Sequence, residues 1–294
     1  MDRTRERLTL FLWAGPAIAL VLFFVLYPLA SMIVSSFSRL SFTGMHQGWA
    51  GWGNYRAVLA DPALSTVMGN TATWTGGVVA GTILVSLGVA LVLNEEFPGR
   101  RVVRWILVIP WATSLIITSL VFAWIFDSRL GTINVLSQDL GLIERPIAFL
   151  GQAFTAMPIL IGVGIFVSVP FTTYVLLAGL QSIPEDVYEA ATTDGAGVLQ
   201  RFWHITMPLL RPFVGLAALL NAIYVFNSFP IIWIMTNGGP INDTHTLITY
   251  MYKVAFSNDE TAKGAALGTA GFMLLLVMGS LYWILLRRAS KGAS

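Results

Sequence analysis

The sequence predicts an all-α membrane protein with six transmembrane helices, and two observations support this fold class. Of 294 residues, 56% are hydrophobic and only 11% are charged. A soluble domain carries about 25% charged residues, so this chain has too few to cover a surface that faces water. Its charged residues also leave six long gaps. Each gap exceeds the roughly 20 residues that cross a hydrocarbon core.

Each gap predicts one membrane-spanning helix. The first apolar stretch is longer than the roughly 7–15 residues of a signal-peptide core, so we expect it to remain as a span. The region 10–286 is therefore the expected transmembrane domain. Its helices are expected, in order, near 10–34, 71–93, 105–126, 158–180, 212–235 and 265–286.

The distribution of basic residues predicts the orientation of these helices. The two ends, 1–9 and 287–294, together with the loops 94–104 and 181–211, hold eleven of the seventeen Lys and Arg residues. Because basic residues concentrate in cytoplasmic segments, both termini and the loop 181–211 are expected to face the cytoplasm.

The residues also exclude several functions. No Gly-x-x-x-x-Gly-Lys-Ser/Thr phosphate loop occurs, no cysteine is present, and the three histidines, His46, His204 and His245, are far apart in sequence. The expected spans hold no ionisable side chain of the kind that proton-coupled carriers use as relays. We therefore expect no catalytic residue, no metal and no cofactor in this chain, and the net charge of +2 does not suggest nucleic acid.

The loop 181–211 is predicted to form two helices joined at a glycine. Ser182 and Glu185 have the spacing of a capping box at the start of the first helix. Gly195 is the residue best able to end it in a left-handed conformation. A second helix is expected from about residue 196 to 206, ending before Pro208. The first helix is acidic, and a solvated acidic face is the alternative reading of Glu185, Asp186, Glu189 and Asp194.

The spacing within this loop resembles the EAA motif of importer-type ABC transporter permeases. The matching residues are Glu189, Ala190, Ala191, Gly195, Ile205 and Pro208, with Met207 where Leu is usual. Other short segments are similar to the carbohydrate-importer subfamily, and the last of them to its maltose-permease F-type half. These are Tyr27-Pro28, Gly53-Asn54-Tyr55, Asn70-Thr71, Ile109-Pro110-Trp111, Phe226-Asn227-Ser228-Phe229, Ile232-Trp233 and Thr236-Asn237-Gly238-Gly239-Pro240.

This resemblance implies a function and a set of partners. The helix that bears Glu189 to Gly195, Asp194 included, would be a coupling helix that docks in a cleft of a cytoplasmic ATPase dimer. ATP and Mg would bind that ATPase. A second, G-type permease would complete the pore, and an extracytoplasmic solute-binding protein would deliver the solute at a bacterial inner (plasma) membrane.

Polar residues in the fourth and fifth spans are candidates for the substrate pathway, because a neutral sugar needs amides, hydroxyls and flat apolar surfaces. The alternative is that they join helices together, as Gly76, Gly77, Gly81 and Gly88 are expected to do by close packing. Two alternative functions are not excluded by the sequence. The first is an importer of another solute (glycerol phosphate, a sulfonate, a polyamine or phosphate), and the second, more remote one is an ATP-independent carrier. The candidate pathway residues are Asn221, Tyr224, Asn227, Phe229, Trp233, Thr172 and Tyr174.

Overall fold

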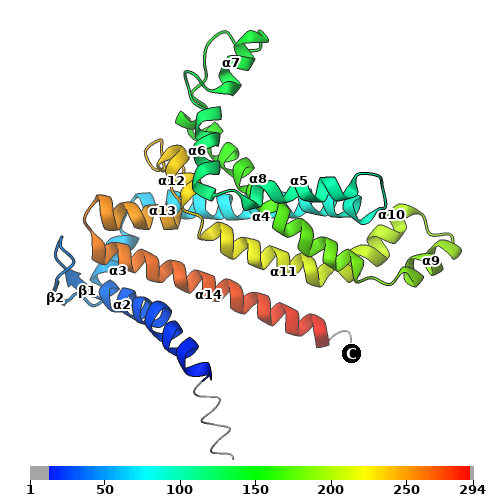
Figure 1. Ribbon diagram of the computed structural model, residues 1–294. Helices are drawn as coiled ribbons and strands as arrows, with labels where there is room; N and C mark the ends of the chain where they lie inside the picture. Colours follow the sequence, from blue (N-terminus) through cyan, green and yellow to red (C-terminus); the bar gives the residue numbers. More distant parts are fainter. Residues whose placement is uncertain (1–12, 292–294) are drawn as a thin grey trace, which may run out of the picture. The chain divides into compact units, whose positions relative to one another are not determined.

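The structure is a computed structural model that describes residues 13–291 (Figure 1). The predicted N-terminal segment 1–9, the first residues of the 10–34 span and residues 292–294 lie outside the described residues. The side chains of Arg287, Arg288 and Lys291 are also outside them.

The described chain is mostly helical, as predicted. It is helical from Trp13 to Ser36, including a π-turn, η1 (Leu22–Leu26), and α2 (Tyr27–Ser36). A hairpin of β1 (Ser38–Leu40) and β2 (His46–Trp49) follows. The other elements are α3 (Gly53–Leu59), α4 (Ala63–Asn94), α5 (Arg100–Ala112), α6 (Leu115–Ile125), α7 (Thr132–Asp139), η2 (Phe149–Gly151), α8 (Ala153–Gln181), α9 (Glu185–Thr193), α10 (Val198–Arg201), η3 (Phe202–Thr206), α11 (Met207–Phe226), α12 (Pro230–Thr236), α13 (Leu247–Tyr252), η4 (Lys253–Ser257) and α14 (Thr261–Lys291).

Within residues 13–291, five helices are long and apolar enough to cross a membrane, and a sixth span is possible if one bent pair counts as one. The five are Trp13–Ser36, Ala63–Asn94, Ala153–Gln181, Val198–Phe226 and Thr261–Ile284. The bent pair is α5 and α6. The multi-span helical class is therefore confirmed.

The third predicted span, 105–126, is not one helix. The structure divides it into α5 and α6, whose axes differ by 93°. Thr113 and Ser114 between them have extended ψ angles of 142° and 131°. Pro110 lies in the preceding turn, where it removes a backbone donor and crowds the carbonyl four residues earlier. The hydropathy of the stretch carries no information on this change of direction.

The fifth predicted span, 212–235, is wrong at both ends. A continuous helix runs from Val198 to Phe226, and a new helix, α12, starts at Pro230. Proline lacks a backbone N–H and suits the first turn of a helix, so Pro230 begins α12 instead of continuing α11. Phe229 and Trp233 consequently lie outside the helix that bears Asn221.

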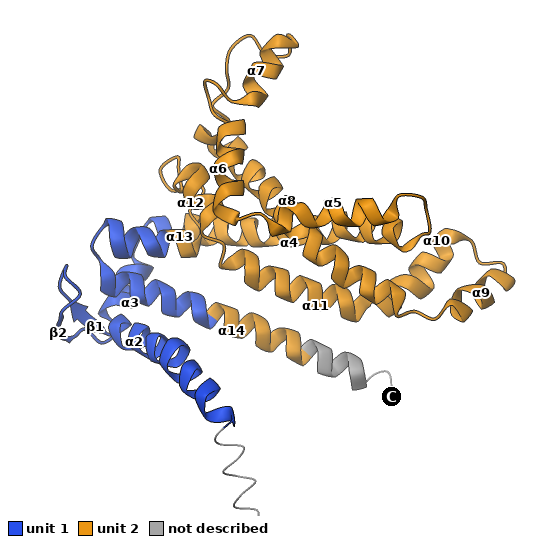
Figure 2. Ribbon diagram, in the orientation of Figure 1, with its two compact units in different colours: residues 1–64, 250–273 blue, residues 65–249, 274–294 orange. Residues whose placement is uncertain are grey.

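The described residues form two compact units, which Figure 2 colours separately: residues 1–64 with 250–273, and residues 65–249 with 274–294. In the second unit, α4 and α8 pack closely. A methyl group added at Gly77 would lie 2.9 Å from Ile161, and one at Gly81 would lie 2.3 Å from Ile165. The predicted close packing is thus confirmed at these two glycines. Gly76 and Gly88 face no described atom within 4 Å.

The first unit contains a partly buried ion pair. Lys263 Nζ lies 2.9 Å from Asp61 Oδ2, and Tyr250 donates its hydroxyl to the same oxygen at 2.8 Å. Burial alone would raise the pKa of Asp61. The hydrogen bonds from Lys263, Tyr250 and the Ala63 backbone and the charge of Lys263 outweigh it, so the pKa lies below its usual 3.8.

Replacing Asp61 by Asn should lower the stability of the protein by about 1–3 kcal/mol at neutral pH, because the Lys263 charge loses its partner. The lowered pKa means that this contribution is complete above the unfolded value of 3.8 and is lost as the pH falls through the folded value. Thermal unfolding in detergent at several pH values measures the difference. It should shrink in acid, whereas Asp139→Asn, at an exposed carboxylate, should have little effect at any pH.

Candidate functional site

The candidate coupling segment, residues 185–208, forms an elbow of two helices. Its first helix, α9, begins after Pro184, and the predicted capping box is absent: no side chain caps this helix. Ser182 instead donates its hydroxyl to the Gly179 carbonyl of the preceding helix at 2.7 Å. A hydroxyl that finds a carbonyl one turn back in its own helix is not available as a cap for the next.

Gly195 ends α9 as predicted. Its φ of +82° is left-handed. The Gly195 N–H donates to the Thr192 carbonyl at 3.0 Å, and the Ala196 N–H donates to the Ala191 carbonyl at 2.9 Å. This pair of bonds is the Schellman arrangement, and it fixes the angle at which the chain leaves α9.

Two side-chain contacts join α9 to the second helix. Arg201 Nη1 donates to Thr192 Oγ1 at 2.7 Å, and the hydroxyls of Tyr188 and Thr206 lie 2.9 Å apart. Thr206 is buried. The sequence does not predict these contacts of Tyr188, Thr192 and Thr206, because nothing in the spacing of these residues indicates which side chains meet across the elbow.

The second helix does not end before Pro208, contrary to the prediction. Residues 202–206 form a π-turn, η3, in which the Met207 N–H bonds to the Phe202 carbonyl. The hydrogen bond in this turn spans five residues instead of four. The helix continues past Pro208 although proline has no backbone N–H to donate. The elbow therefore continues without a break into the long helix Val198–Phe226.

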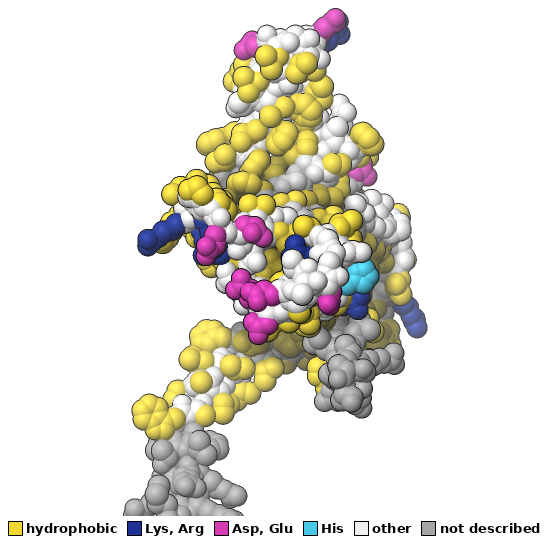
Figure 3. Space-filling view, turned by 90° about the vertical axis from the view of Figure 1, so that its right-hand side faces the viewer, with side chains coloured by type: hydrophobic (Ala, Val, Ile, Leu, Met, Phe, Trp, Pro, Cys, Tyr) yellow, Lys and Arg dark blue, Asp and Glu magenta, His cyan; other side chains and the backbone are white. Residues whose placement is uncertain are grey.

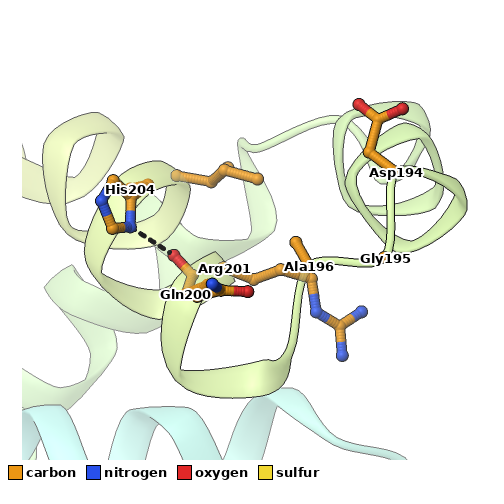
Figure 4. A pocket seen from close by; sticks show the side chains of 7 residues that line it. Asp194, Gly195, Ala196, Gln200, Arg201 and His204 are labelled. Atoms are coloured by element: carbon orange, nitrogen blue, oxygen red, sulfur yellow. Dashed lines mark hydrogen bonds between the residues drawn. The ribbon is translucent and has the colours of Figure 1, made fainter.

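A pocket of about 400 Å³ lies in the bend of the elbow (Figure 4). Gln200 closes one side, where its Oε1 accepts the Gly197 N–H at 3.0 Å, and the His204 ring bonds to the Gln200 carbonyl at 3.0 Å. The pocket is lined by Asp194, Gly195, Ala196, Gln200, Arg201, His204 and Ile205.

The predicted coupling residues fall into two groups. Glu189, Ala190, Asp194 and Gly195 are exposed, whereas Ala191, Ile205 and Pro208 are half-buried. Figure 3 faces the side on which α9 and α10 lie in Figure 1, and it shows Asp and Glu side chains gathered there. Three apolar side chains beside them, Val198, Leu199 and Trp203, are 58–75% exposed. This face of the elbow therefore combines acidic side chains with exposed apolar ones.

The candidate pathway residues lie in different surroundings. Asn221 and Thr172 are buried, Tyr224 and Asn227 are exposed, and the Tyr174 hydroxyl donates to the Arg104 carbonyl at 2.9 Å. Asn227 also donates to the Ile223 carbonyl of its own helix at 2.8 Å. Only part of the predicted set therefore comes together.

We call the buried polar residues of α8 and α11 the polar seam, and of the predicted set only Thr172 and Asn221 belong to it. A methyl group on Gly179 of α8 would meet Leu210 and Phe213 of α11, and Val163 shares a core cluster with Val225. The two helices therefore pack against each other, and Asn221 and Ser168 are both buried. Both amide atoms of Asn221 and the hydroxyls of Ser168 and Thr173 have no hydrogen-bond partner among the described residues.

Phe229 and Trp233 form an aromatic stack at the start of α12. Their ring centroids lie 5.2 Å apart at an interplanar angle of 21°, and the His245 ring lies 6.2 Å from Trp233. Both aromatic residues are half-buried. The stack offers a flat apolar surface. The prediction that both aromatic residues lie on the same helix as Asn221 is wrong.

Within the described residues, several helices long and apolar enough to cross a membrane define a multi-span membrane protein. Residues 77–291 match the family model described as the binding-protein-dependent transport system inner membrane component. The chain belongs to this family of ABC transporter permeases, as the EAA-like spacing predicted, and is a multi-pass membrane protein.

Several relatives match over nearly their whole length. A probable ABC transporter permease protein of Brucella suis is 41% identical and covers 91% of this chain and 92% of its own. The sulfoquinovosyl glycerol permease protein SmoG of Agrobacterium fabrum is 35% identical, with coverage of 96% and 91%. The trehalose/maltose permease protein MalF of Thermococcus litoralis is 32% identical, with coverage of 95% and 93%.

The fold also resembles a solved structure. A chain of a bacterial ABC transporter involved in the import of the acidic polysaccharide alginate superimposes with a TM-score of 0.84, over 98% of this chain and 99% of its own. The two are 22% identical in sequence, so the likeness concerns the fold alone.

Proposed function

We propose that this chain is the F-type permease subunit of an ABC importer that moves a sugar or sugar derivative across the bacterial inner membrane. Transport would proceed by alternating access, driven by ATP hydrolysis in a partner subunit. The membership of the family and the names of two relatives, SmoG and MalF, support the solute class.

One observation supports the coupling step most directly. The first helix of the elbow, α9, is hydrogen-bonded to Arg201 and Thr206, which belong to the helix Val198–Phe226. That helix is 29 residues long and also carries Asn221. At a rise of 1.5 Å per residue, it extends about 43 Å. A displacement of α9 by an ATPase dimer would therefore reach the polar seam through one rigid element.

The remaining partners follow from this assignment. The distribution of Lys and Arg supports a cytoplasmic location for the elbow and both termini, where an ATPase with bound ATP and Mg would contact Glu189 and Gly195. A G-type permease would complete the pathway, and a solute-binding protein would supply the outer face.

The solute would contact the polar seam, where Asn221 and Ser168 have hydrogen-bonding groups to offer to sugar hydroxyls. A sulfonated sugar is the second candidate, because SmoG is the relative with a named solute at 35% identity. Basic side chains near the pathway would favour it, and Arg129, in the segment between α6 and α7, is exposed.

Purification of the tagged chain from its native membrane in mild detergent tests the proposal. We expect a second permease and a phosphate-loop ATPase to co-elute, and mass spectrometry identifies them. Added solute-binding protein then reports the solute that it retains. Elution of the chain alone, in a form that still transports without ATP, would instead establish an ATP-independent carrier.

A further inference from the structure

The hairpin segment, residues 37–59, displays apolar side chains that nothing in its own unit covers. It belongs to the first compact unit and follows the helix Trp13–Ser36 directly. Its large exposed side chains, with the exposed fraction of each, are Phe42 (80%), Met45 (67%), Trp49 (65%), Trp52 (64%) and Leu59 (76%).

The segment holds these side chains in a fixed arrangement. At the hairpin tip, the Ser41 N–H donates to the Met45 carbonyl at 2.9 Å, and the Met45 N–H donates to the Ser41 hydroxyl at 3.1 Å. At the base, Asn54 Nδ2 donates to the carbonyls of Ser36 and Ser38 at 2.8 and 2.9 Å. The tip that carries Phe42 is therefore built onto the end of the preceding helix.

The described part of that helix is long enough to carry the segment to one face of the membrane. The 24 described residues from Trp13 to Ser36 extend about 36 Å, and a hydrocarbon core is about 30 Å thick. A span of this length brings its end, Ser36, to the level of the lipid headgroups. Phe37 and Trp52 have ring centroids 5.2 Å apart, so Trp52 lies at the same level.

The charge of the segment fits the same environment. Residues 37–59 contain no Asp or Glu, and both arginines, Arg39 and Arg56, are exposed. Within the part of the chain that the structure describes, neither arginine forms an ion pair with a carboxylate. Exposed aromatic and basic residues without acidic ones are typical of protein surfaces that lie in a membrane interface.

We propose that the hairpin segment is a membrane anchor that lies in the lipid headgroup layer at the end of the first span. Phe42 and Met45 at the tip enter the boundary between headgroups and acyl chains, while Arg39 and Arg56 bind lipid phosphates. The occupant of this apolar surface is the bilayer and not a protein. The inference depends on membrane insertion, which the family establishes, and not on the identity of the transported solute.

Site-directed fluorescence tests this proposal cleanly because the chain has no cysteine. Phe42→Cys and Met45→Cys variants of the full chain are labelled with bimane and reconstituted in vesicles of phosphatidylethanolamine and phosphatidylglycerol. Lipids with a spin label near the headgroup, and aqueous iodide, serve as competing quenchers. Gln138→Cys, on the exposed polar surface of α7, is the control.

We expect the spin-labelled lipid to quench bimane at 42 and 45 at least about threefold more than at 138, and iodide to show the opposite order. An Arg39→Gln/Arg56→Gln background should reduce lipid quenching when phosphatidylglycerol is present but not in its absence. Equal iodide quenching at 42 and 138 would place the tip in water and overturn the proposal. Protection from iodide without lipid quenching would mean that a protein covers the tip, which also overturns it.

Discussion

Replacing Gly195 by Val should reduce solute uptake by about tenfold or more while the chain still inserts into the membrane. The residue has a φ of +82°, which a β-branched side chain adopts only with strain. The backbone would move to relieve that strain, and the bonds from Gly195 and Ala196 that close α9 would break. The direction of α9, and with it the position of Glu189, would then change relative to the second helix of the elbow.

The matched control for this experiment is Gly195→Asn. Asparagine accepts the left-handed conformation far better than other non-glycine residues, and a methyl group at this position meets no described atom within 4 Å. The Asn variant should therefore keep most of the uptake. ATP hydrolysis and uptake are measured together on the purified complex. Normal uptake by the Val variant would contradict the coupling assignment, and loss in both variants would point to the side chain and not to the backbone conformation.

The Gly195 elbow and the apolar spans are features that the sequence could predict. Both depend on local or additive properties: a residue that tolerates positive φ, and a count of apolar residues against the thickness of a bilayer. The gaps between charged residues predicted helices near 158–180 and 71–93, and the structure has longer helices at Ala153–Gln181 and Ala63–Asn94 that begin several residues earlier.

The errors came from prolines, whose effect depends on their surroundings. Pro208 was expected to end a helix, but the π-turn at residues 202–206 accommodates it. Pro230 was expected within a span, but it begins α12. Pro110 precedes a bend of 93°. Hydrogen-bond register and helix direction are properties of the packed structure, and hydropathy does not contain them.

The contacts across the elbow and the polar seam were likewise beyond local reasoning. Tyr188 and Thr206 are separated by 18 residues, and they meet only because the elbow folds back at Gly195. Asn221 was a candidate from its residue type, but its burial follows from the packing of the helices and not from its local sequence.

An Asn221→Leu variant should be more stable than the natural protein and yet transport poorly. Asn221 is only 4% exposed, and neither its amide nitrogen nor its carbonyl oxygen has a partner among the described residues. A buried polar group without a partner costs about 1–3 kcal/mol, so a similarly branched apolar side chain should raise the unfolding temperature. If a solute hydroxyl uses these atoms during transport, the same change should lower uptake by about tenfold or more.

Thr82→Val supplies the matched control. The Thr82 side chain is fully buried, and its hydroxyl also has no partner among the described residues, but it lies on α4 and not on the helix that carries Asn221. Its replacement should raise stability and leave uptake unchanged. Thermal unfolding and uptake of the solute retained by the binding protein are measured for both variants. A stabilised Asn221→Leu protein with normal uptake would make Asn221 a helix-packing residue. A destabilised protein with impaired uptake would indicate that the Asn221 amide is hydrogen-bonded in the assembled transporter, because removing a bonded buried polar group costs stability.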